Sequence, residues 1–410
     1  MQIGDLLELN ITDVAFGGDG VARLAQPASG PAGEAPTGGR VVFVPLVLPG
    51  ERVEGVITGI TARFARAECR RVLVPSPARV SPTCPHFGVC GGCRYQHAAQ
   101  PLQLQMKRKQ VVDILQRIGG FEAPPVESMT SAPLSYGYRN KLTLHGPGRP
   151  GFHRLDGGSL LPIESCPLAC EAINRKLGGL KEMRLKAGDD LTIRSTTAGV
   201  VFTYRSRARR RSREMPGMDI ITETWDGLSC RVPVRSFFQV NHVVHELLLA
   251  RVARLLGEES TSILVDAYCG AGVFALSLAG QAQSVIGLES DPAAVACAVD
   301  NAAALRLTNT IFRRGHVENL LGQALCKSVA DRICVILDPP RAGCDVKVIR
   351  VLARERPHRI FYLSCVPPVL ARDLKILCAG GYELRRIIPF DMFPQTAHVE
   401  VLAELSLPRV

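Results

Sequence analysis

The stretch that decides the fold is VDAYCGAGVFAL, Val265–Leu276. It has the pattern of an apolar strand, Ser262–Ala267, followed by a short glycine loop and the start of a helix. Gly270 and Gly272 would let the backbone approach a ligand closely, and the first N–H groups of the helix would face that loop. A single G-x-G is a weak signal alone, so its interpretation depends on the surrounding sequence.

Strands and helices alternate around this stretch. Further apolar strands are expected at Ser284–Leu288, Cys334–Leu337 and Arg359–Leu363, and helices at Pro292–Leu305 and Pro367–Leu377. This alternation predicts a doubly wound α/β sheet from about Ser236 to the end of the chain. In such a sheet, ligands bind at the carboxyl ends of the strands.

The acidic residue that ends the second strand indicates the kind of ligand. Glu289 follows VIGL, where its carboxylate would accept hydrogen bonds from both ribose hydroxyls of a nucleoside. NAD carries a pyrophosphate and usually meets a longer G-x-G-x-x-G loop. S-adenosylmethionine has no phosphate and is compatible with the shorter loop. We therefore expect a methyl donor rather than NAD.

Three more reactive side chains are expected in the same crevice. Asp338 follows a strand in ILDPPRAG, the next strand ends YLSC at Cys365, and DMFPQTAHVE sets Glu400 on a late strand. Pyrimidine C5 accepts a methyl group readily only after a thiolate adds to C6, and a base must then remove the C5 proton. Core cysteines are commoner by residue type, but the strand-end position favours Cys365 as nucleophile and Glu400 as base.

The first half of the chain has a different pattern. Short alternating runs separated by glycine and proline turns predict a small β-barrel over residues 1–75; the runs include Leu6–Ile11, Val41–Pro45 and Arg52–Ile60. Within it, Pro27–Gly39 lacks bulky side chains and predicts a long hairpin loop. A helix is expected at Gln100–Ile118, ended by Gly119-Gly120, and short strands are expected across residues 126–235.

Three cysteines gather in CPHFGVCGGC, as Cys84, Cys90 and Cys93. Glycines between them would let the backbone wrap around an ion or cluster. A fourth soft ligand is needed, and Cys166 in ESCPLAC is preferred, with Cys170 in reserve. Four thiolates suit either tetrahedral zinc or an iron–sulfur cluster, and the spacing does not decide between them.

Composition narrows the class of protein. With 410 residues, 46% hydrophobic and 21% charged, the chain is expected to be globular and multi-domain rather than disordered. Lys and Arg exceed Asp and Glu by 49 to 38, so the net charge of +11 would attract polyanions. The run RSRARRRSR, Arg205–Arg213, concentrates this charge, either as a phosphate contact or as a solvated hairpin tip.

The N-terminus has no basic segment followed by an apolar run, and no apolar stretch approaches the ~18 residues of a membrane span. We therefore expect a cytoplasmic protein that does not contact membranes. In that reducing compartment, clustered cysteines indicate metal binding or catalysis rather than disulfides.

Taken together, five segments resemble the RNA uracil-C5 methyltransferases: SFFQVN (Ser236–Asn241), DAYCGAGVFAL, DPPRAG, YLSCVPPVLARDL (Tyr362–Leu374) and DMFPQTAHVE. PSPARVSPTCPHFGVCGGCRYQH is similar to the start of that family's iron–sulfur domain. Residues 1–75, with LPGERV, resemble its TRAM domain, an OB-like RNA-binding barrel. The chain departs from the family at Val366, which stands where an Asn is usual and precedes two prolines instead of one.

The resemblance implies roles for individual residues. Cys365 would add to C6 and Glu400 would remove the C5 proton. The S-adenosylmethionine site would be lined by Gln239, Tyr268, Gly270, Glu289 and Asp338. The cysteines Cys84, Cys90, Cys93 and Cys166 would hold a [4Fe-4S] cluster rather than zinc. His316 would contact the adenine. For His398 the resemblance implies no role, and the simplest alternative is that it orients its own turn through a hydrogen bond.

The resemblance to this family also implies a domain organisation: a TRAM barrel at 1–75, a central α+β domain with the cluster at 76–235, and a Rossmann-like class I methyltransferase domain at 236–410. The helix at 100–118 is expected to pack on the last of these. Aromatic and basic positions of the barrel are candidates for RNA contact, and the alternative is that half or more of them are barrel core or solvated surface: Phe16, Arg23, Phe43, Arg63, Phe64 and Arg66.

The expected protein is a monomer that acts on RNA. Among RNAs, 23S ribosomal RNA is favoured because the family's transfer-RNA enzymes are expected to lack both barrel and cluster. The alternatives are a transfer-RNA uridine-C5 methyltransferase, a catalytically inactive RNA-binding protein of the same fold and a cytosine-C5 methyltransferase. Retention of Cys365, Glu400, Asp338 and Gln239 argues against the inactive form. The SCVPP sequence differs from the Pro-Cys or Thr-Cys setting typical of cytosine enzymes.

Overall fold

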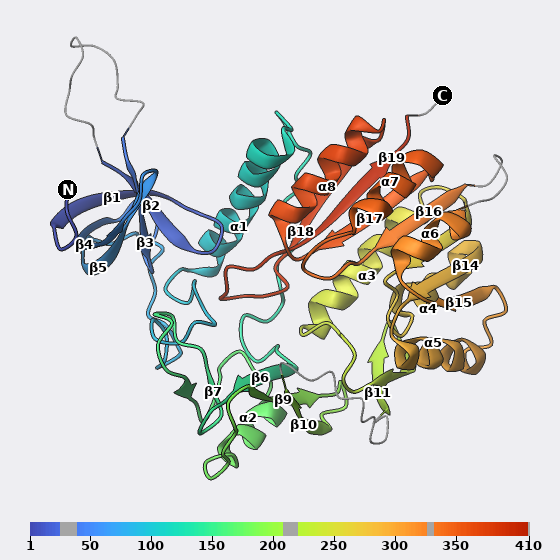
Figure 1. The fold of residues 1–410 in the computed structure, drawn as a ribbon, viewed down its shortest axis with the longest axis horizontal. Coiled ribbons are helices and arrows are strands. Elements are labelled where there is room, and N and C mark those ends of the chain that lie inside the picture. The colour runs from blue at the N-terminus through green and yellow to red at the C-terminus, as the bar shows by residue number, and fades with distance from the viewer. Residues whose placement is uncertain (25–38, 208–219, 326–331, 409–410) are drawn as a thin grey trace. The chain divides into compact units, whose positions relative to one another are not determined.

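The computed structural model describes residues 1–24, 39–207, 220–325 and 332–408 (Figure 1). Residues 27–38 of the expected hairpin loop and 208–213 of the arginine run lie outside the described residues. The chain forms two compact units. The first contains Met1–Gln110, His153–Ser159 and Gln395–Ala397, and the second contains Val111–Phe152, Leu160–Pro394 and His398–Val410. The expected domain boundaries after residues 75 and 235 do not coincide with this division and stay predictions.

The first unit contains a closed five-stranded barrel with strand order β1-β2-β3-β5-β4. The strands are β1 (Leu6–Val14), β2 (Asp19–Arg23), β3 (Val41–Pro45), β4 (Arg52–Ile60) and β5 (Phe64–Val74). Alternate residues point inward, so Leu9, Val42 and Val53 are buried together in the barrel core. The barrel predicted from the alternating runs is therefore confirmed, and β3 and β4 have the predicted limits.

The predicted helix at 100–118 forms with a change of pitch. Residues Gln100–Ile114 are α1, and Leu115–Gly119 continue as a π-helical turn, η1. Gly120 ends it with φ 76°, a left-handed conformation that glycine adopts without strain. Within the second unit, η1 contacts α8 (Pro367–Ala379).

The second unit contains two small sheets. One has the order β10-β9-β6-β7-β8, from β6 (Lys141–His145), β7 (Gly151–Phe152), β8 (Leu161–Pro162), β9 (Asp189–Ser195) and β10 (Val201–Arg207), and α2 (Glu171–Gly178) contacts β9. The other is the hairpin of β11 (Ile220–Trp225) and β12 (Leu228–Pro233). Buried Arg194 donates to the Val234 and Ser236 carbonyls and pairs with Glu223. This fixes the turn that leaves the hairpin.

The large sheet of the second unit has seven strands in the order β15-β14-β13-β16-β17-β19-β18. They are β13 (Thr261–Ala267), β14 (Ala282–Glu289), β15 (Thr310–Arg314), β16 (Ile333–Leu337), β17 (Arg359–Ser364), β18 (Glu383–Phe390) and β19 (Glu400–Ser406). Neighbours from β15 to β17 are parallel, whereas β19 runs antiparallel to both β17 and β18. The predicted doubly wound α/β sheet is confirmed.

Helices cover this sheet. They are α3 (His242–Leu256), α4 (Val273–Ser277), α5 (Pro292–Ala304), α6 (Val317–Leu325), α7 (Val346–Glu355) and α8, with a short 3₁₀ turn η2 (Ala279–Gln281). Residues of α3, α4 and α5 share one apolar core, and α7 contacts both α6 and α8 (Figure 1). Every residue of β16, β17 and β19 is buried, as expected for strands covered on both faces.

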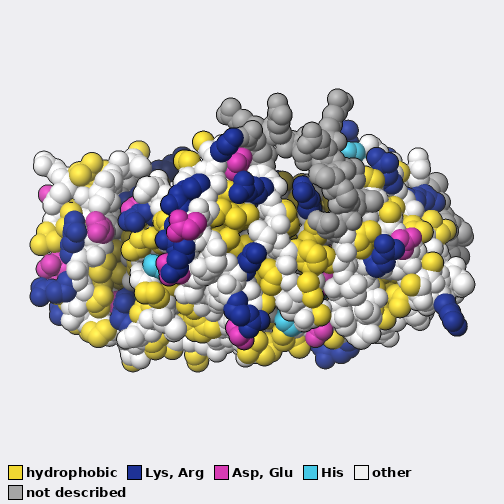
Figure 2. Space-filling model, turned by 90° about the horizontal axis from the view of Figure 1, so that it is seen from below, with side chains coloured by type: hydrophobic (Ala, Val, Ile, Leu, Met, Phe, Trp, Pro, Cys, Tyr) yellow, Lys and Arg dark blue, Asp and Glu magenta, His cyan; other side chains and the backbone are white. Residues whose placement is uncertain are grey.

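Two surface properties bear on the expected partners. Within the described ranges, no helix combines the length and apolar character that crossing a membrane requires. Lys and Arg side chains are scattered over the face drawn in Figure 2, and several lie beside Asp or Glu. Among the described residues on this face, the positive charge is therefore distributed rather than concentrated in one patch.

Candidate active site

The reactive side chains predicted from the sequence lie at one edge of the large sheet. The parallel strands β13, β14, β16 and β17 all end there, so Tyr268, Glu289, Asp338 and Cys365 are at or just beyond their carboxyl ends. Because β19 is antiparallel, its first residue, Glu400, lies at the same edge. The fold thus assembles residues that are up to 132 positions apart, Tyr268 to Glu400, in the sequence.

Cys365 and Glu400 face each other across two neighbouring strands. The register of β17 and β19 runs from Arg359 opposite Ser406 to Ser364 opposite Val401. Continued by one residue, it places Cys365 opposite Glu400. After the thiol, the Val366 amide donates to the Ser364 hydroxyl at 3.1 Å, and α8 begins at Pro367. The unusual Val-Pro-Pro sequence therefore still leads from the strand directly into a helix.

The surroundings of this pair disfavour negative charge. Burial raises the pKa of the Cys365 thiol, the Glu400 carboxylate raises it further, and a hydrogen bond from Arg341 lowers it. Burial also raises the pKa of Glu400 well above its usual range, Asp338 adds to this, and Arg341 opposes it. Burial raises the pKa of Asp338 to about 7. One guanidinium thus stabilises the charged forms of both the thiol and the glutamate.

Arg341 is a functional candidate that the sequence reasoning did not single out. It lies in DPPRAG, three residues after Asp338, and the two prolines between them restrict the backbone. Its Nη2 lies 3.5 Å from Nδ1 of His398, whose ring packs edge-on against Phe393. His398 is thus a partner of Arg341, and whether it also orients its own turn stays a prediction. The sequence signal that could have identified Arg341 is its position shortly after Asp338, the acidic residue at the end of a strand.

A chain of hydrogen bonds holds the loop that follows Arg341. The Cys344 amide donates to the Tyr362 hydroxyl at 3.2 Å, and that hydroxyl donates to the Asp373 carboxylate at 2.7 Å. The Cys344 thiol also hydrogen-bonds Tyr268. Asp373 comes from the ARDL segment and is 1% exposed. The chain connects α8, strand β17 and the glycine loop, and its members were not predicted from the sequence.

The glycine loop between β13 and α4 leaves space for a ligand. Tyr268, Gly270 and Gly272 have φ angles of 68°, 55° and 89°. A Cβ at Gly270 would have no neighbouring heavy atom within 4 Å, so the loop is open at this point. The Gly270 amide donates to Glu289 Oε2 at 3.1 Å. The glycine loop and Glu289, the acidic residue at the end of β14, therefore lie together, as predicted from the sequence.

A fully buried carboxyl lies beneath this loop. Oδ2 of Asp266 accepts the Ala275 amide at 2.9 Å, whereas Oδ1 has no hydrogen-bond partner among the described residues. Burial raises the pKa of Asp266 to about 7, and the charges of Asp338 and Glu289 contribute to the increase. Asp266, Glu289 and Asp338 thus bring three carboxyls close to the open glycine loop, in addition to Glu400 at the same edge. This arrangement suits a cationic ligand that carries hydroxyl groups.

Gln239 lies in a segment that is held from two sides. It is 6% exposed, and its backbone carbonyl accepts Asn140 Nδ2 at 3.0 Å. Two residues later, Asn241 caps α3 and donates to the Met392 carbonyl. His316 lies beyond β15 with an exposed side chain 3.8 Å from Glu318. Contacts of Gln239 and His316 with a nucleoside stay predictions.

The four predicted cluster ligands belong to different compact units. Cys84, Cys90 and Cys93 are half-buried in the first unit, where the Gly92 amide donates to Cys90 Sγ at 3.5 Å. Cys166 belongs to the second unit. Across the described part of the chain, no three or more His, Cys, Asp or Glu side chains are grouped so that they could hold a metal ion. The metal centre stays a prediction.

The strand order, the glycine loop and the acid at the end of the second strand define an S-adenosylmethionine-dependent methyltransferase fold. Comparison with known families narrows this class. A model of the tRNA (uracil-5-)-methyltransferases matches residues 226–406, and the TRAM domain model matches residues 1–69.

Relatives match along nearly the whole chain. An uncharacterized RNA methyltransferase of Synechocystis is 33% identical over 97% of this chain and 95% of its own. An uncharacterized RNA methyltransferase of Nostoc is 34% identical over 98% of this chain and 97% of its own. The solved tRNA (uracil-54, C5)-methyltransferase of Pyrococcus abyssi, in complex with S-adenosyl-L-homocysteine, superimposes with a TM-score of 0.70 and 25% identity, over 97% of this chain and 100% of that one. The chain belongs to the TRAM-containing RNA uracil-C5 methyltransferase family and is an S-adenosylmethionine-dependent enzyme.

The position of Arg341 predicts its effect on the thiol. Arg341→Met removes an influence that lowers the pKa of Cys365, so less thiolate is present at neutral pH. Alkylation of Cys365 by iodoacetamide should slow by about tenfold, as expected for loss of one charge-assisted hydrogen bond. Peptide mass spectrometry across a pH series measures this rate. The matched control is Arg350→Met, an exposed arginine of α7. An unchanged alkylation profile in Arg341→Met would contradict the assignment.

Proposed function

We propose that the enzyme methylates a uridine through a covalent bond between Cys365 and C6, with Glu400 as the base that completes the reaction. The observation that carries this proposal is the juxtaposition of the two side chains across β17 and β19, beside Arg341 and Asp338. A structural cysteine needs neither a guanidinium bonded to its thiol nor a buried glutamate opposite it.

The proposed steps balance in atoms and electrons. The Cys365 thiolate adds to C6, forming the S–C6 bond and making C5 enolate-like. C5 then takes the methyl group, and the electrons of the broken sulfur–methyl bond stay on the donor sulfur. Glu400 removes the C5 proton, the C–H electrons form the C5–C6 double bond, and the S–C6 bond breaks to release the thiolate. A raised pKa makes the Glu400 carboxylate a stronger proton acceptor once it is ionised.

The edge of the sheet fits the methyl donor. S-adenosylmethionine supplies an activated methyl group and carries a positively charged sulfonium. Glu289 would bind the ribose hydroxyls, while Tyr268, Gly270 and Gln239 would surround the nucleoside. Support comes from the open space at Gly270 and from the pKa of about 7 of Asp338, because a cation beside that carboxyl favours its ionised form.

Two variants separate the roles of the thiol and the carboxylate. With RNA containing 5-fluorouridine, which has no C5 proton to remove, the parent enzyme should form a stable covalent adduct. Cys365→Ala should form none. Glu400→Gln should accumulate an adduct with ordinary RNA, because methyl transfer proceeds and elimination stalls. Denaturing gel electrophoresis detects these adducts. An adduct that persists in Cys365→Ala would exclude this residue as the nucleophile.

Ribosomal RNA is the proposed substrate class, and transfer RNA is the second candidate. The sequence-based prediction of ribosomal RNA depended on the barrel combined with four cysteines. However, the Pyrococcus abyssi transfer-RNA enzyme superimposes on 97% of this chain, which must include most of the barrel. The expectation that transfer-RNA enzymes of the family lack the barrel is therefore wrong, and only the cysteines still favour ribosomal RNA.

The barrel offers a surface for RNA. Phe43 and Phe64 pack edge to face with centroids 5.4 Å apart, and the Arg66 guanidinium lies 5.8 Å from the Phe64 ring. Arg66 is exposed and the two rings are half-exposed. Such a group would stack bases and contact phosphates of single-stranded RNA. These contacts would offset the few kcal/mol needed to extrude a uridine from folded RNA.

Mapping of modified nucleosides identifies the substrate. Cells that lack this gene should lose one 5-methyluridine from large-subunit ribosomal RNA, and a plasmid copy should restore it, whereas a Cys365→Ala copy should not. Mass spectrometry of ribosomal and transfer RNA fragments makes the measurement. Loss from transfer RNA alone would overturn the ribosomal assignment and support the second candidate. If no 5-methyluridine is lost, both candidates fail.

We also propose that Cys84, Cys90, Cys93 and Cys166 hold a [4Fe-4S] cluster and that the enzyme is a cytoplasmic monomer. The cluster is supported by three half-buried thiols on one loop and by the amide that donates to Cys90 Sγ. A reducing cytoplasm would keep these thiols and Cys365 free of disulfides.

Colour distinguishes iron–sulfur from zinc. Protein purified without oxygen should be brown, with visible absorbance that bleaches on reduction. Cys90→Ser should lose most of this absorbance, whereas Cys378→Ser, on α8, should retain it. Absorbance spectra with iron and zinc analysis measure both metals. A colourless parent enzyme that contains zinc would contradict the cluster.

A further inference from the structure

We propose that a buried ion pair, Arg359 with Glu404, is a positioning device that keeps the nucleophile opposite the base. The pair holds the register of β17 against β19, and Cys365 and Glu400 meet only in that register. The inference rests on the proposed function of these two residues. Neither member of the pair would touch the substrate, so both act through the strands that carry the reactive groups.

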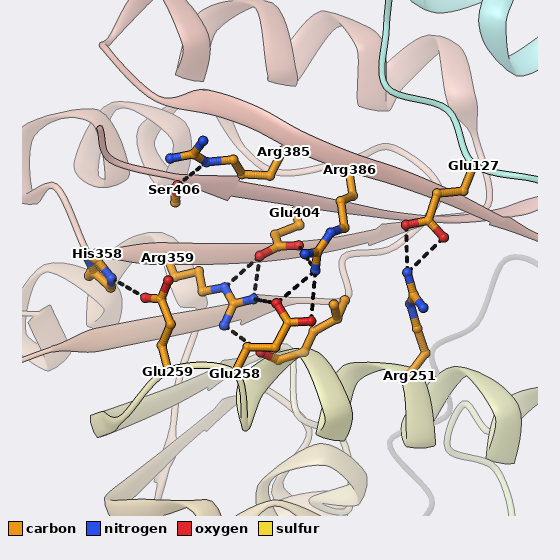
Figure 3. Close-up of polar contacts among 11 residues, drawn as sticks. Glu127, Arg251, Glu258, Glu259, His358, Arg359, Arg385, Arg386, Glu404 and Ser406 are labelled. Carbon is orange, nitrogen blue, oxygen red and sulfur yellow. Dashed lines mark hydrogen bonds and ion pairs between the residues drawn. The ribbon is translucent and has the colours of Figure 1, made fainter. Parts of the chain in front are cut away.

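The pair is fully enclosed and fully bonded. Arg359 and Glu404 are each 4% exposed. Arg359 Nε donates to Glu404 Oε1 at 2.8 Å, and Nη2 donates to the same carboxylate (Figure 3). The remaining nitrogen, Nη1, donates to the Leu255 carbonyl at 2.6 Å, in the last turn of α3. The two charges thus satisfy each other at a single relative position of the strands.

The pair and the reactive groups lie on one face of the sheet. Alternate residues of a strand share a face, so Arg359, Phe361 and Cys365 lie together on β17, and Glu400 and Glu404 lie on the same face of β19. Phe361 is directly opposite Glu404, and its ring lies 4.7 Å from the Arg359 guanidinium. Six residues, about 20 Å, separate Arg359 from Cys365.

Hydrophobic patterning cannot set this register. A strand with one buried face resists slipping because its apolar residues would become exposed. Every residue of β17 and of β19 is buried, so that penalty is weak here. A slip of one residue would put Cys365 and Glu400 on opposite faces, and a slip of two would separate them by about 7 Å more. Either slip would break the bonds between the two buried charges and leave the Arg359 guanidinium without its buried carboxylate, which is strongly unfavourable.

The neighbouring strand is tied to the same carboxylate. Arg386 of β18 is the register partner of Glu404 and donates to its Oε2 at 3.1 Å. Arg386 also pairs with Glu258 at 3.0 Å, and Glu258 lies 3.7 Å from Arg359 (Figure 3). Arg386 and Glu258 are partly exposed, so their pair is screened by solvent. We therefore infer that the buried Arg359–Glu404 pair fixes the register and that the Arg386–Glu258 pair only supports it.

A substitution that keeps the core filled tests the proposal. Arg359→Met/Glu404→Leu removes both charges without leaving one unpaired, and such replacements often preserve stability. Glu404→Gln is the second variant, because it retains the volume and a hydrogen-bond acceptor. The matched control is Arg251→Met/Glu127→Leu. That pair joins α3 to the segment before β6 and does not connect β17 with β19 (Figure 3).

The readout must separate positioning from stability. The urea midpoint of unfolding should change little in the double variant, because no charge is left unpaired in the core. The Kd for S-adenosylmethionine should also change little, because β13 and β14 carry the cofactor loop and Glu289. The single-turnover rate of adduct formation on 5-fluorouridine RNA should fall by at least tenfold, and the KM for RNA should stay within twofold. Hydrogen exchange of the β17 and β19 amides should accelerate relative to β13. Glu404→Gln should show a smaller loss of rate, and the control pair none.

Each outcome of these measurements either supports or overturns the register proposal. A parental rate in the double variant overturns the register proposal, as does an equal loss in the control pair. If the double variant does not fold, Glu404→Gln decides by the same rate measurement, and a parental rate there also overturns the proposal. If the parent enzyme itself forms no adduct, the proposed function fails, and that result is distinct from failure of the register proposal.

Discussion

The antiparallel insertion of β19 between β17 and β18 is the constraint on which the site depends. In an all-parallel sheet the first residue of β19 would lie at the opposite edge from the ends of β13, β16 and β17. Reversal of this one strand brings Glu400 to the edge where Cys365 and Asp338 emerge. The register then sets which residues face each other, and a buried charge pair about 13 to 20 Å away along the same strands is suited to fix it.

The electrostatics of the edge follow from burial. Asp266, Asp338, Glu400 and Cys365 all have raised pKa values because the protein displaces the water that would stabilise their charges. Arg341 is the cation that opposes this effect at both reactive groups. An acidic, desolvated edge with an open glycine loop is suited to a cationic methyl donor. Arg341, which hydrogen-bonds the Cys365 thiol, favours the ionised form of that thiol.

Much of this architecture is predictable from sequence because it depends on local patterns. Strand ends marked by Glu289, Asp338 and Cys365 could be located from apolar runs and the turns that follow, and parallel pairing then brings them together. Arg341, Asp373 and the Arg359–Glu404 pair were not found, because their partners are distant in sequence and no local periodicity reports a hydrogen bond. The predicted domain boundaries and the predicted cysteine cluster combine segments that belong to different compact units, and no local pattern reports such a combination.

The central claim is that Cys365 is the residue that bonds to the pyrimidine. The most direct measurement is tandem mass spectrometry of the peptide that remains attached to a 5-fluorouridine nucleotide after protease and nuclease digestion of the adduct. The nucleotide mass is expected on the sulfur of Cys365, in the peptide that contains SCVPP. Attachment to Cys344 or Cys269, which also lie near the glycine loop, would contradict it.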